Sequence, residues 1–166
     1  MTKCADNTAE QAIRVTRDRI DYDTREYPLE VIMGKYSHET GKKPEIYVPN
    51  ICRSLDEWTE AKQSKFIESI LIGVPLRTIV LRDEESTARL EVVDGKQRLF
   101  AIANFIGNTL ALADLSILKE LNGLTFQGLP RSRRLRFNRT TFRVIILSPS
   151  VDKEMRGYLR ECMSSH

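Results

Sequence analysis

The spacing of hydrophobic residues in the middle of the chain predicts a helix, a hairpin and a second helix. One helical face carries the apolar stripe Trp58, Phe66, Ile67, Ile70 and Leu71. Ser54-Leu55-Asp56-Glu57 has the order of a capping box and predicts the start of this helix, while Gly73 and Pro75 predict its end. We therefore expect an amphipathic helix that ends at Gly73.

Two β-rich runs follow, residues 78–81 and 89–93, and the polar stretch 82–88 between them predicts an antiparallel hairpin. After Asp94-Gly95 the hydrophobic spacing changes to that of a helix, which closes at Gly107. Its apolar positions are Leu99, Phe100, Ile102, Ala103 and Ile106. The sequence thus predicts a strand-turn-helix with Asp94 at the turn.

The flanking segments are shorter. We expect residues 1–26 to form an extended polar arm and residues 27–166 to form the domain. Short elements are predicted at 45–49 (strand), 115–121 (helix), 122–126 (extended), 141–147 (strand) and 152–163 (helix), with a loop at 36–44. Together they predict a mixed α/β domain with a small mixed sheet and flanking helices.

Composition excludes several classes of protein. The chain has 166 residues, the size of one domain, and no apolar stretch approaches the ~20 residues of a membrane span. Its start lacks the apolar core of a signal peptide, so we expect a cytoplasmic protein without a membrane partner. Three distant cysteines and two histidines (His38 and His166) match no metal spacing, and we expect neither zinc nor haem.

Charge is balanced overall, at a net +3, but not locally. Residues 121–151 contain six arginines and no acidic residue, which leaves the remainder at −3. Such a concentration suits a polyanion, and the candidate DNA-binding residues are Arg131, Arg133, Arg134, Arg136 and Arg139. An Arg-rich loop that pairs with acids elsewhere is the alternative.

Asp94-Gly95-Lys96-Gln97-Arg98 is the main candidate for chemistry. A helix N-terminus favours anions, and Lys96 and Arg98 add charges that suit phosphate. Asp94 is a candidate ligand for Mg²⁺ or water. Alternatively, Asp94 only caps the helix and the two cations are solvated. No Gly-Lys pair completes a Walker loop. A metal-nuclease pair of Asp83 and Asp94 is excluded because the hairpin would separate them by roughly 17 Å.

An ordered series of motifs resembles the N-terminal domain of GmrSD-type restriction endonucleases, over roughly residues 27–163. The motifs that carry the resemblance are Ile46-Tyr47-Val48-Pro49, Arg53, Trp58, the run from Lys62 to Pro75, Val92-Val93-Asp94-Gly95-Lys96-Gln97-Arg98-Leu99, and Leu121-Asn122-Gly123-Leu124-Thr125-Phe126 with Leu129-Pro130. The resemblance implies a ParB/sulfiredoxin-like fold and a bacterial system of defence against phage or modified DNA. It also implies nucleotide binding and hydrolysis at Asp94–Arg98, and an HNH-type nuclease domain on a partner chain or on a missing C-terminal part.

This resemblance assigns roles to particular residues. Asp94, Gln97 and Arg98 are the catalytic candidates, with Mg²⁺ and a nucleoside triphosphate as ligands. Arg53, Gly95, Lys96 and Arg98 are the phosphate-binding candidates. We expect Lys62, Gln63 and Ser64 to be surface residues, and Glu68 to support the site by pairing with Arg98 or Arg53.

The chain also departs from the family pattern at three places. Cys52 precedes Arg53 where the family has Gln, Lys96 replaces a Gln, and Leu159-Arg160-Glu161-Cys162-Met163-Ser164 replaces a motif with Glu-Arg and Asn. Loss of neutral groups that position water weakens turnover more than affinity. A binding domain with weakened catalysis, a DNA-binding adaptor and a remnant that packs on a partner chain are the three functional hypotheses.

Overall fold

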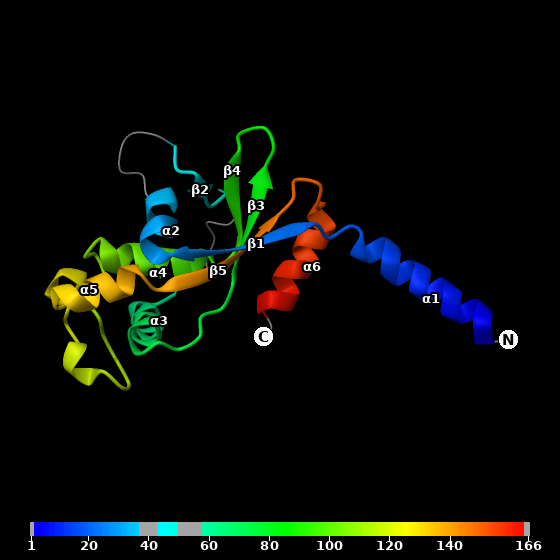
Figure 1. Cartoon of the computed structure of the whole chain (residues 1–166). Helices are drawn as coiled ribbons and strands as arrows, with labels where there is room; N and C mark the ends of the chain where they lie inside the picture. Colours follow the sequence, from blue (N-terminus) through cyan, green and yellow to red (C-terminus); the bar gives the residue numbers. More distant parts are fainter. Residues whose placement is uncertain (1, 37–42, 50–57, 165–166) are drawn as a thin grey trace.

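Five strands and six α-helices make up the part of the chain that the structure describes, which in this computed structural model is residues 2–36, 43–49 and 58–164 (Figure 1). The strands are β1 (Tyr22–Pro28), β2 (Ile46–Tyr47), β3 (Ile79–Glu84), β4 (Arg89–Asp94) and β5 (Thr141–Leu147). The helices are α1 (Thr2–Arg17), α2 (Leu29–Tyr36), α3 (Glu60–Ile72), α4 (Lys96–Ile106), α5 (Arg131–Asn138) and α6 (Lys153–Ser164), with short 3₁₀ turns at Lys119–Leu121 and Phe126–Gly128. The predicted mixed α/β fold is confirmed.

The strands form one mixed sheet in the order β1-β5-β3-β4-β2. The predicted hairpin is the antiparallel pair β3–β4, whereas β3–β5 and β2–β4 are parallel. The β3–β4 register shifts between Val80 and Leu81, so that Val80 faces Asp94 and Leu81 faces Val92. This bulge leaves Val93 as the extra residue, directly before the turn into α4.

Alternating strand residues build two cores, one on each face of the sheet. Ile79, Leu81 and Val144 belong to the main core, which packs against α2, α3, α4 and α5. Val80, Val93 and Leu147 belong to a smaller core on the other face, with Val151 and Met155. Figure 1 accordingly shows α6 apart from the other helices, across the strands. The domain therefore holds its last helix through a core of its own.

The extended conformation expected for residues 1–26 is wrong. Residues 2–17 form α1, which Figure 1 shows projecting away from the domain, and residues 22–28 form β1, which pairs with β5 from Tyr22↔Leu147 to Pro28↔Thr141. Alanine, glutamate and arginine give the first segment helix propensity. β1 is an edge strand whose positions are mostly exposed and three of them charged, so it lacks the apolar alternation that marks a strand.

The helix predicted from the Ser54 capping box to Gly73 begins later than expected. It starts at Glu60, and its cap is Thr59, whose hydroxyl accepts the Lys62 N–H at 3.3 Å. The Ser54 capping box lies outside the described residues, as does most of the predicted loop 36–44. Gly73, with a φ of 84°, ends the helix as predicted. The predicted elements at 45–49, 141–147 and 152–163 correspond to β2, β5 and α6.

The surface positions expected for Gln63 and Ser64 of α3 are wrong, and so is the pairing of Glu68 with Arg98, while Arg53, the other expected partner of Glu68, lies outside the described residues. Gln63 and Ser64 are buried instead of lying on the surface. Glu68 is 4% exposed and pairs with neither Arg98 nor another arginine of the described chain. Its carboxylate accepts the backbone N–H groups of Ser116, Ile117 and Leu118, at 3.2, 2.7 and 2.7 Å. These bonds lower the pKa of Glu68 below its ordinary value despite burial.

The same three bonds explain why the expected helix at 115–121 is wrong. Backbone N–H groups of residues 116–118 bond to a carboxylate instead of to carbonyls of a preceding turn, so only Lys119–Leu121 forms a 3₁₀ turn. Residues 122–126 form a turn and join the loop at Leu112 through paired backbone bonds. The Arg-rich segment, which the alternative interpretation described as a loop, is the helix α5.

Candidate functional site

The turn between β4 and α4 is built around Gly95. Its φ of 102° lies in the left-handed region, and a Cβ placed there would lie 3.2 and 3.3 Å from the side-chain carbons of Ile79. Glycine is therefore required both by conformation and by space. Because Gly95 also caps α4, Asp94 is the last residue of β4 and not the helix cap. The simple capping interpretation of Asp94 is wrong.

Arg98 connects this turn to the start of β3 through hydrogen bonds. One terminal nitrogen donates to the carbonyls of Arg77 and Thr78, at 2.7 and 3.0 Å, and the other donates to Asp94 Oδ2 at 2.6 Å. The residue is 8% exposed, so the interpretation of a solvated Arg98 is wrong as well. Burial lowers the pKa of Arg98, the neighbouring Arg77 lowers it further, and Asp94 raises it.

A cavity of about 690 Å³ opens beside this turn. Its size is within the range of small-molecule sites. Among the described lining residues, five are basic, and they come from four parts of the fold: Lys62 of α3, Arg77 before β3, Lys96 and Arg98 of α4, and Arg160 of α6. Asp94 is the single acidic residue among the lining residues in the described chain, and Arg98 already neutralises it. The cavity therefore attracts anions.

Arg160 and Arg77 retain hydrogen-bond donors that no described residue of the chain occupies. Arg160 donates its Nε to the carbonyl of Val93, the bulge residue, at 3.1 Å. Its terminal nitrogens, and the whole guanidinium of Arg77, form no bond to the residues that the structure describes. The positive charge of Arg77 lowers the pKa of Arg98. An anion placed between them would lower this repulsion.

Trp58 forms an aromatic wall of the cavity and is held firmly. The backbone N–H of Trp58 donates to Gln97 Oε1 at 3.2 Å, and its backbone carbonyl accepts a hydrogen bond from Gln63 Nε2 at 2.9 Å. The ring packs edge-on against Phe66 with centroids 5.5 Å apart, and the Lys62 ammonium lies 5.1 Å from the centre of the indole. Gln97 thus positions Trp58 through its backbone.

The structure brings together most of the residues that the sequence nominated for this site. Asp94, Gly95, Lys96, Gln97 and Arg98 all line the cavity. Arg53 and Cys52 lie outside the described residues. Arg77 and Arg160 were missed as site residues, because they are distant in sequence and only the fold brings them to the turn. The departure from the family motif at Leu159–Ser164 was the one signal that pointed to Arg160.

The residues around Asp94 do not fit a magnesium site formed by protein side chains. Its Oδ2 is bonded to a guanidinium, and the other charged lining residues are cations that repel a metal ion. No group of three or more His, Cys, Asp or Glu side chains occurs among the described residues. The fitting ligand is an anion, and Mg²⁺ at this site would have to be held by phosphate oxygens.

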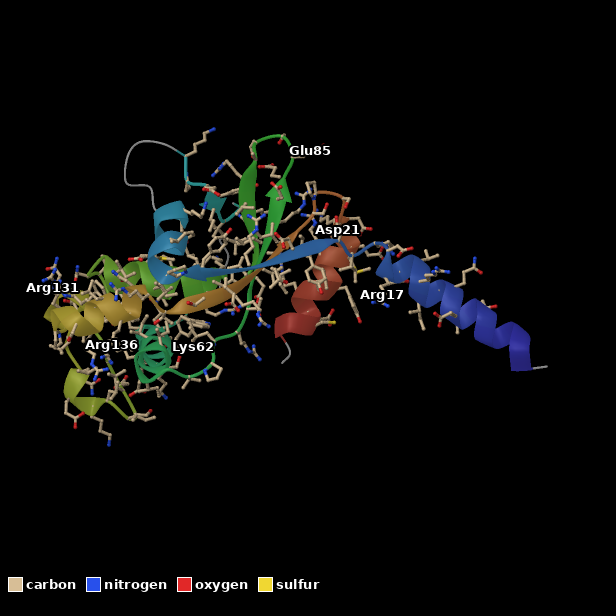
Figure 2. The ribbon with its side chains drawn as sticks, in the orientation of Figure 1. Arg17, Asp21, Lys62, Glu85, Arg131 and Arg136 are labelled. Atoms are coloured by element: carbon tan, nitrogen blue, oxygen red, sulfur yellow. The ribbon has the colours of Figure 1, made fainter. Side chains whose placement is uncertain are left out.

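A second basic surface lies on α5. It consists of Arg131, Arg133, Arg134, Arg136 and the capping residue Arg139, which we call the α5 arginines. In the described chain none of the five forms an ion pair, whereas Arg143 of β5 lies 3.7 Å from Glu26. Figure 2 shows Arg131 and Arg136 at the opposite end of the domain from Arg17 of α1. The alternative interpretation, in which these arginines pair with acids elsewhere, is not met by the described residues.

Fold and cavity together define a mixed α/β domain with an anion-attracting pocket at a strand-turn-helix. The family model for the N-terminal domain of the GmrSD restriction endonuclease matches residues 30–159, and the chain belongs to this family. Membership indicates a component of a restriction and defence system. No curated protein and no solved structure matches the chain significantly. Of the helices described, none combines the length and the apolar character needed to cross a membrane.

Proposed function

We propose that the chain is a nucleotide-binding regulatory domain of a GmrSD-like restriction system, and that the cavity beside Asp94 binds the nucleotide. The observation that carries this proposal is the convergence of Lys62, Arg77, Lys96 and Arg160 on one cavity, where Asp94, the single carboxylate among the described lining residues, is already paired. Arginine matches phosphate oxygens with two donors at once, and a triphosphate is the common cellular ligand with matching charge.

The nominated catalytic residues support binding more directly than hydrolysis. Asp94 bonds to Arg98, Arg98 bonds to two carbonyls, and Gln97 bonds to the Trp58 N–H, so all three hold the walls of the cavity. Hydrolysis is tested by phosphate release from a panel of nucleoside triphosphates with Mg²⁺, with and without duplex DNA. Turnover that disappears in folded Asp94→Asn supports hydrolysis at this turn, and absence of turnover leaves a domain that only binds.

Binding is tested by calorimetric titration of nucleoside triphosphates into the wild-type chain, Arg77→Met and Arg160→Met. We expect each variant to bind roughly ten-fold more weakly or worse, because hydrogen bonds to charged groups contribute about 1.5–3 kcal/mol. The matched control is Arg131→Met, which removes a guanidinium from α5 and leaves the cavity intact. Equal affinity in all four proteins would contradict the proposal.

A regulatory role follows from where Arg160 is attached. It belongs to α6, which packs on the sheet through the small core of Val80, Val93, Leu147, Val151 and Met155. A ligand held by Arg160 therefore bears directly on the position of this last helix. The HNH-type nuclease on a partner chain, or on a continuation of this one, is the expected recipient of such a signal in a system of this family.

DNA binding by the α5 arginines is the second candidate function. Five guanidinium groups without ion pairs in the described chain favour it. Neutralising phosphates releases counterions, so affinity for duplex DNA is expected to fall steeply with salt. Arg131→Met/Arg136→Met should weaken binding and reduce the salt slope by about two, while Arg77→Met should not. An unchanged slope in the α5 variant would refute this function.

A further inference from the structure

The cavity contains an apolar wall that a phosphate ligand alone does not use. Besides its cations, it is lined by Trp58, Phe66, Pro75 and Leu76. Phosphate oxygens gain nothing from such a surface, whereas the flat face of a nucleobase gains from stacking on an aromatic ring. The lining therefore matches a ligand with one flat apolar part and one strongly anionic part.

Trp58 is prepared for stacking by the contacts that hold it. Gln97 and Gln63 bind its two backbone groups, and the ring of Phe66 lies at 69° to the indole with the two ring centroids 5.5 Å apart. The backbone of Trp58 is therefore held in place before a ligand binds, and preorganisation of this kind favours affinity.

We infer that Trp58 is the stacking surface for a nucleobase, so that the site takes nucleoside polyphosphates in preference to bare polyphosphate. This inference rests on the proposed function and gives its ligand class. Lys62 occupies one face of the indole in the present structure, at 5.1 Å. Occupation of that face by a base displaces the ammonium, which lies in the same cavity as Arg77, Lys96 and Arg160 and then becomes available to the phosphates.

The test compares a nucleoside triphosphate with inorganic tripolyphosphate, which has a similar charge and no base. Trp58 is the only tryptophan of the chain, so indole fluorescence reports directly on this wall. We expect the wild-type chain to bind the nucleotide at least roughly ten-fold more tightly than tripolyphosphate, since stacking on an aromatic side chain contributes a factor of roughly 5 to 150. The nucleotide should quench the fluorescence and tripolyphosphate should not.

Two variants complete the experiment. Trp58→Leu keeps an apolar side chain but removes the ring, and it should bind the nucleotide only as tightly as tripolyphosphate, with tripolyphosphate affinity unchanged. Trp58→Phe keeps a smaller ring and should retain an intermediate preference. Unchanged tripolyphosphate binding also shows that each variant is folded.

Each outcome has a separate meaning. Equal affinity of the wild-type chain for both ligands, or a nucleotide affinity that Trp58→Leu does not change, would overturn the stacking role and leave the anion site intact. If Trp58→Leu does not fold, the wild-type affinities and quenching decide alone. Failure of both ligands to bind would overturn the proposed function itself.

Discussion

Arg98→Met tests whether the hydrogen bonds of this arginine stabilise the fold around the site. Methionine fills a similar volume but leaves Asp94 and the carbonyls of Arg77 and Thr78 without the bonds that they receive at 2.6, 2.7 and 3.0 Å. Removing one partner of a buried ion pair costs about 3–5 kcal/mol. The Arg98 side chain is 10% exposed but that of Asp94 is 21% exposed, so water solvates the carboxylate in part. We therefore expect a loss of about 3 kcal/mol in the free energy of unfolding, at the lower end of that range.

For a domain of this size each kcal/mol corresponds to about 2–4 °C in Tm, so thermal unfolding followed by circular dichroism should show a decrease of roughly 6–12 °C. The control is Arg77→Met, whose guanidinium has no bond within the described residues and whose loss should change stability by at most about 0.5 kcal/mol. Adding Asp94→Asn to Arg98→Met should restore part of the loss by removing the unpaired charge. Equal Tm values for Arg98→Met and Arg77→Met would refute the structural role.

Two further predictions concern the turn and the buried carboxylate. Gly95→Ala should lower the free energy of unfolding by about 1–3 kcal/mol in a urea titration, because the added Cβ would press on Ile79 and the φ of 102° is unfavourable for alanine. The control is Gly34→Ala, whose Cβ would meet no atom within 4 Å and which should be neutral or stabilising. Equal urea midpoints for the two variants would contradict this prediction. The lowered pKa of Glu68 contributes stability that is complete above the ordinary pKa of 4.5 and is lost as the pH falls through the lowered native pKa. Glu68→Gln should therefore be less stable than the wild-type chain at neutral pH, and its stability should change less as the pH falls. If the stability of both proteins falls in parallel, another carboxylate is responsible.

Local patterns predicted the centre of the fold. The β3–β4 hairpin, Gly95 and α4 are specified by residues that are close in sequence, and their periodicity changes at Asp94. β1 was missed because its polar residues become a strand only through pairing with β5, more than 100 residues later. α5 was missed because arginine occupies half of its eight positions, and its core contact rests on Phe137.

The candidate site was predicted in part for the same reason. The motif at Asp94–Arg98 could be recognised in the sequence, but the hydrogen bonds that its side chains form could not be predicted from it. Glu68 bonds to backbone groups that lie 48 to 50 residues away, and no residue type marks such a partner in advance. Arg77 reaches the cavity from the segment before β3, and Arg160 reaches it from α6. The ParB-like relationship and the domain boundary at residue 27 stay predictions.

A crystal structure of the chain with a non-hydrolysable nucleoside triphosphate tests the nucleotide site most directly. We expect the phosphates between Arg77, Lys96 and Arg160, with the base against Trp58 and the Asp94–Arg98 pair unchanged. Nucleotide bound instead at the α5 arginines, with the cavity beside Asp94 unoccupied at saturating ligand, would contradict it.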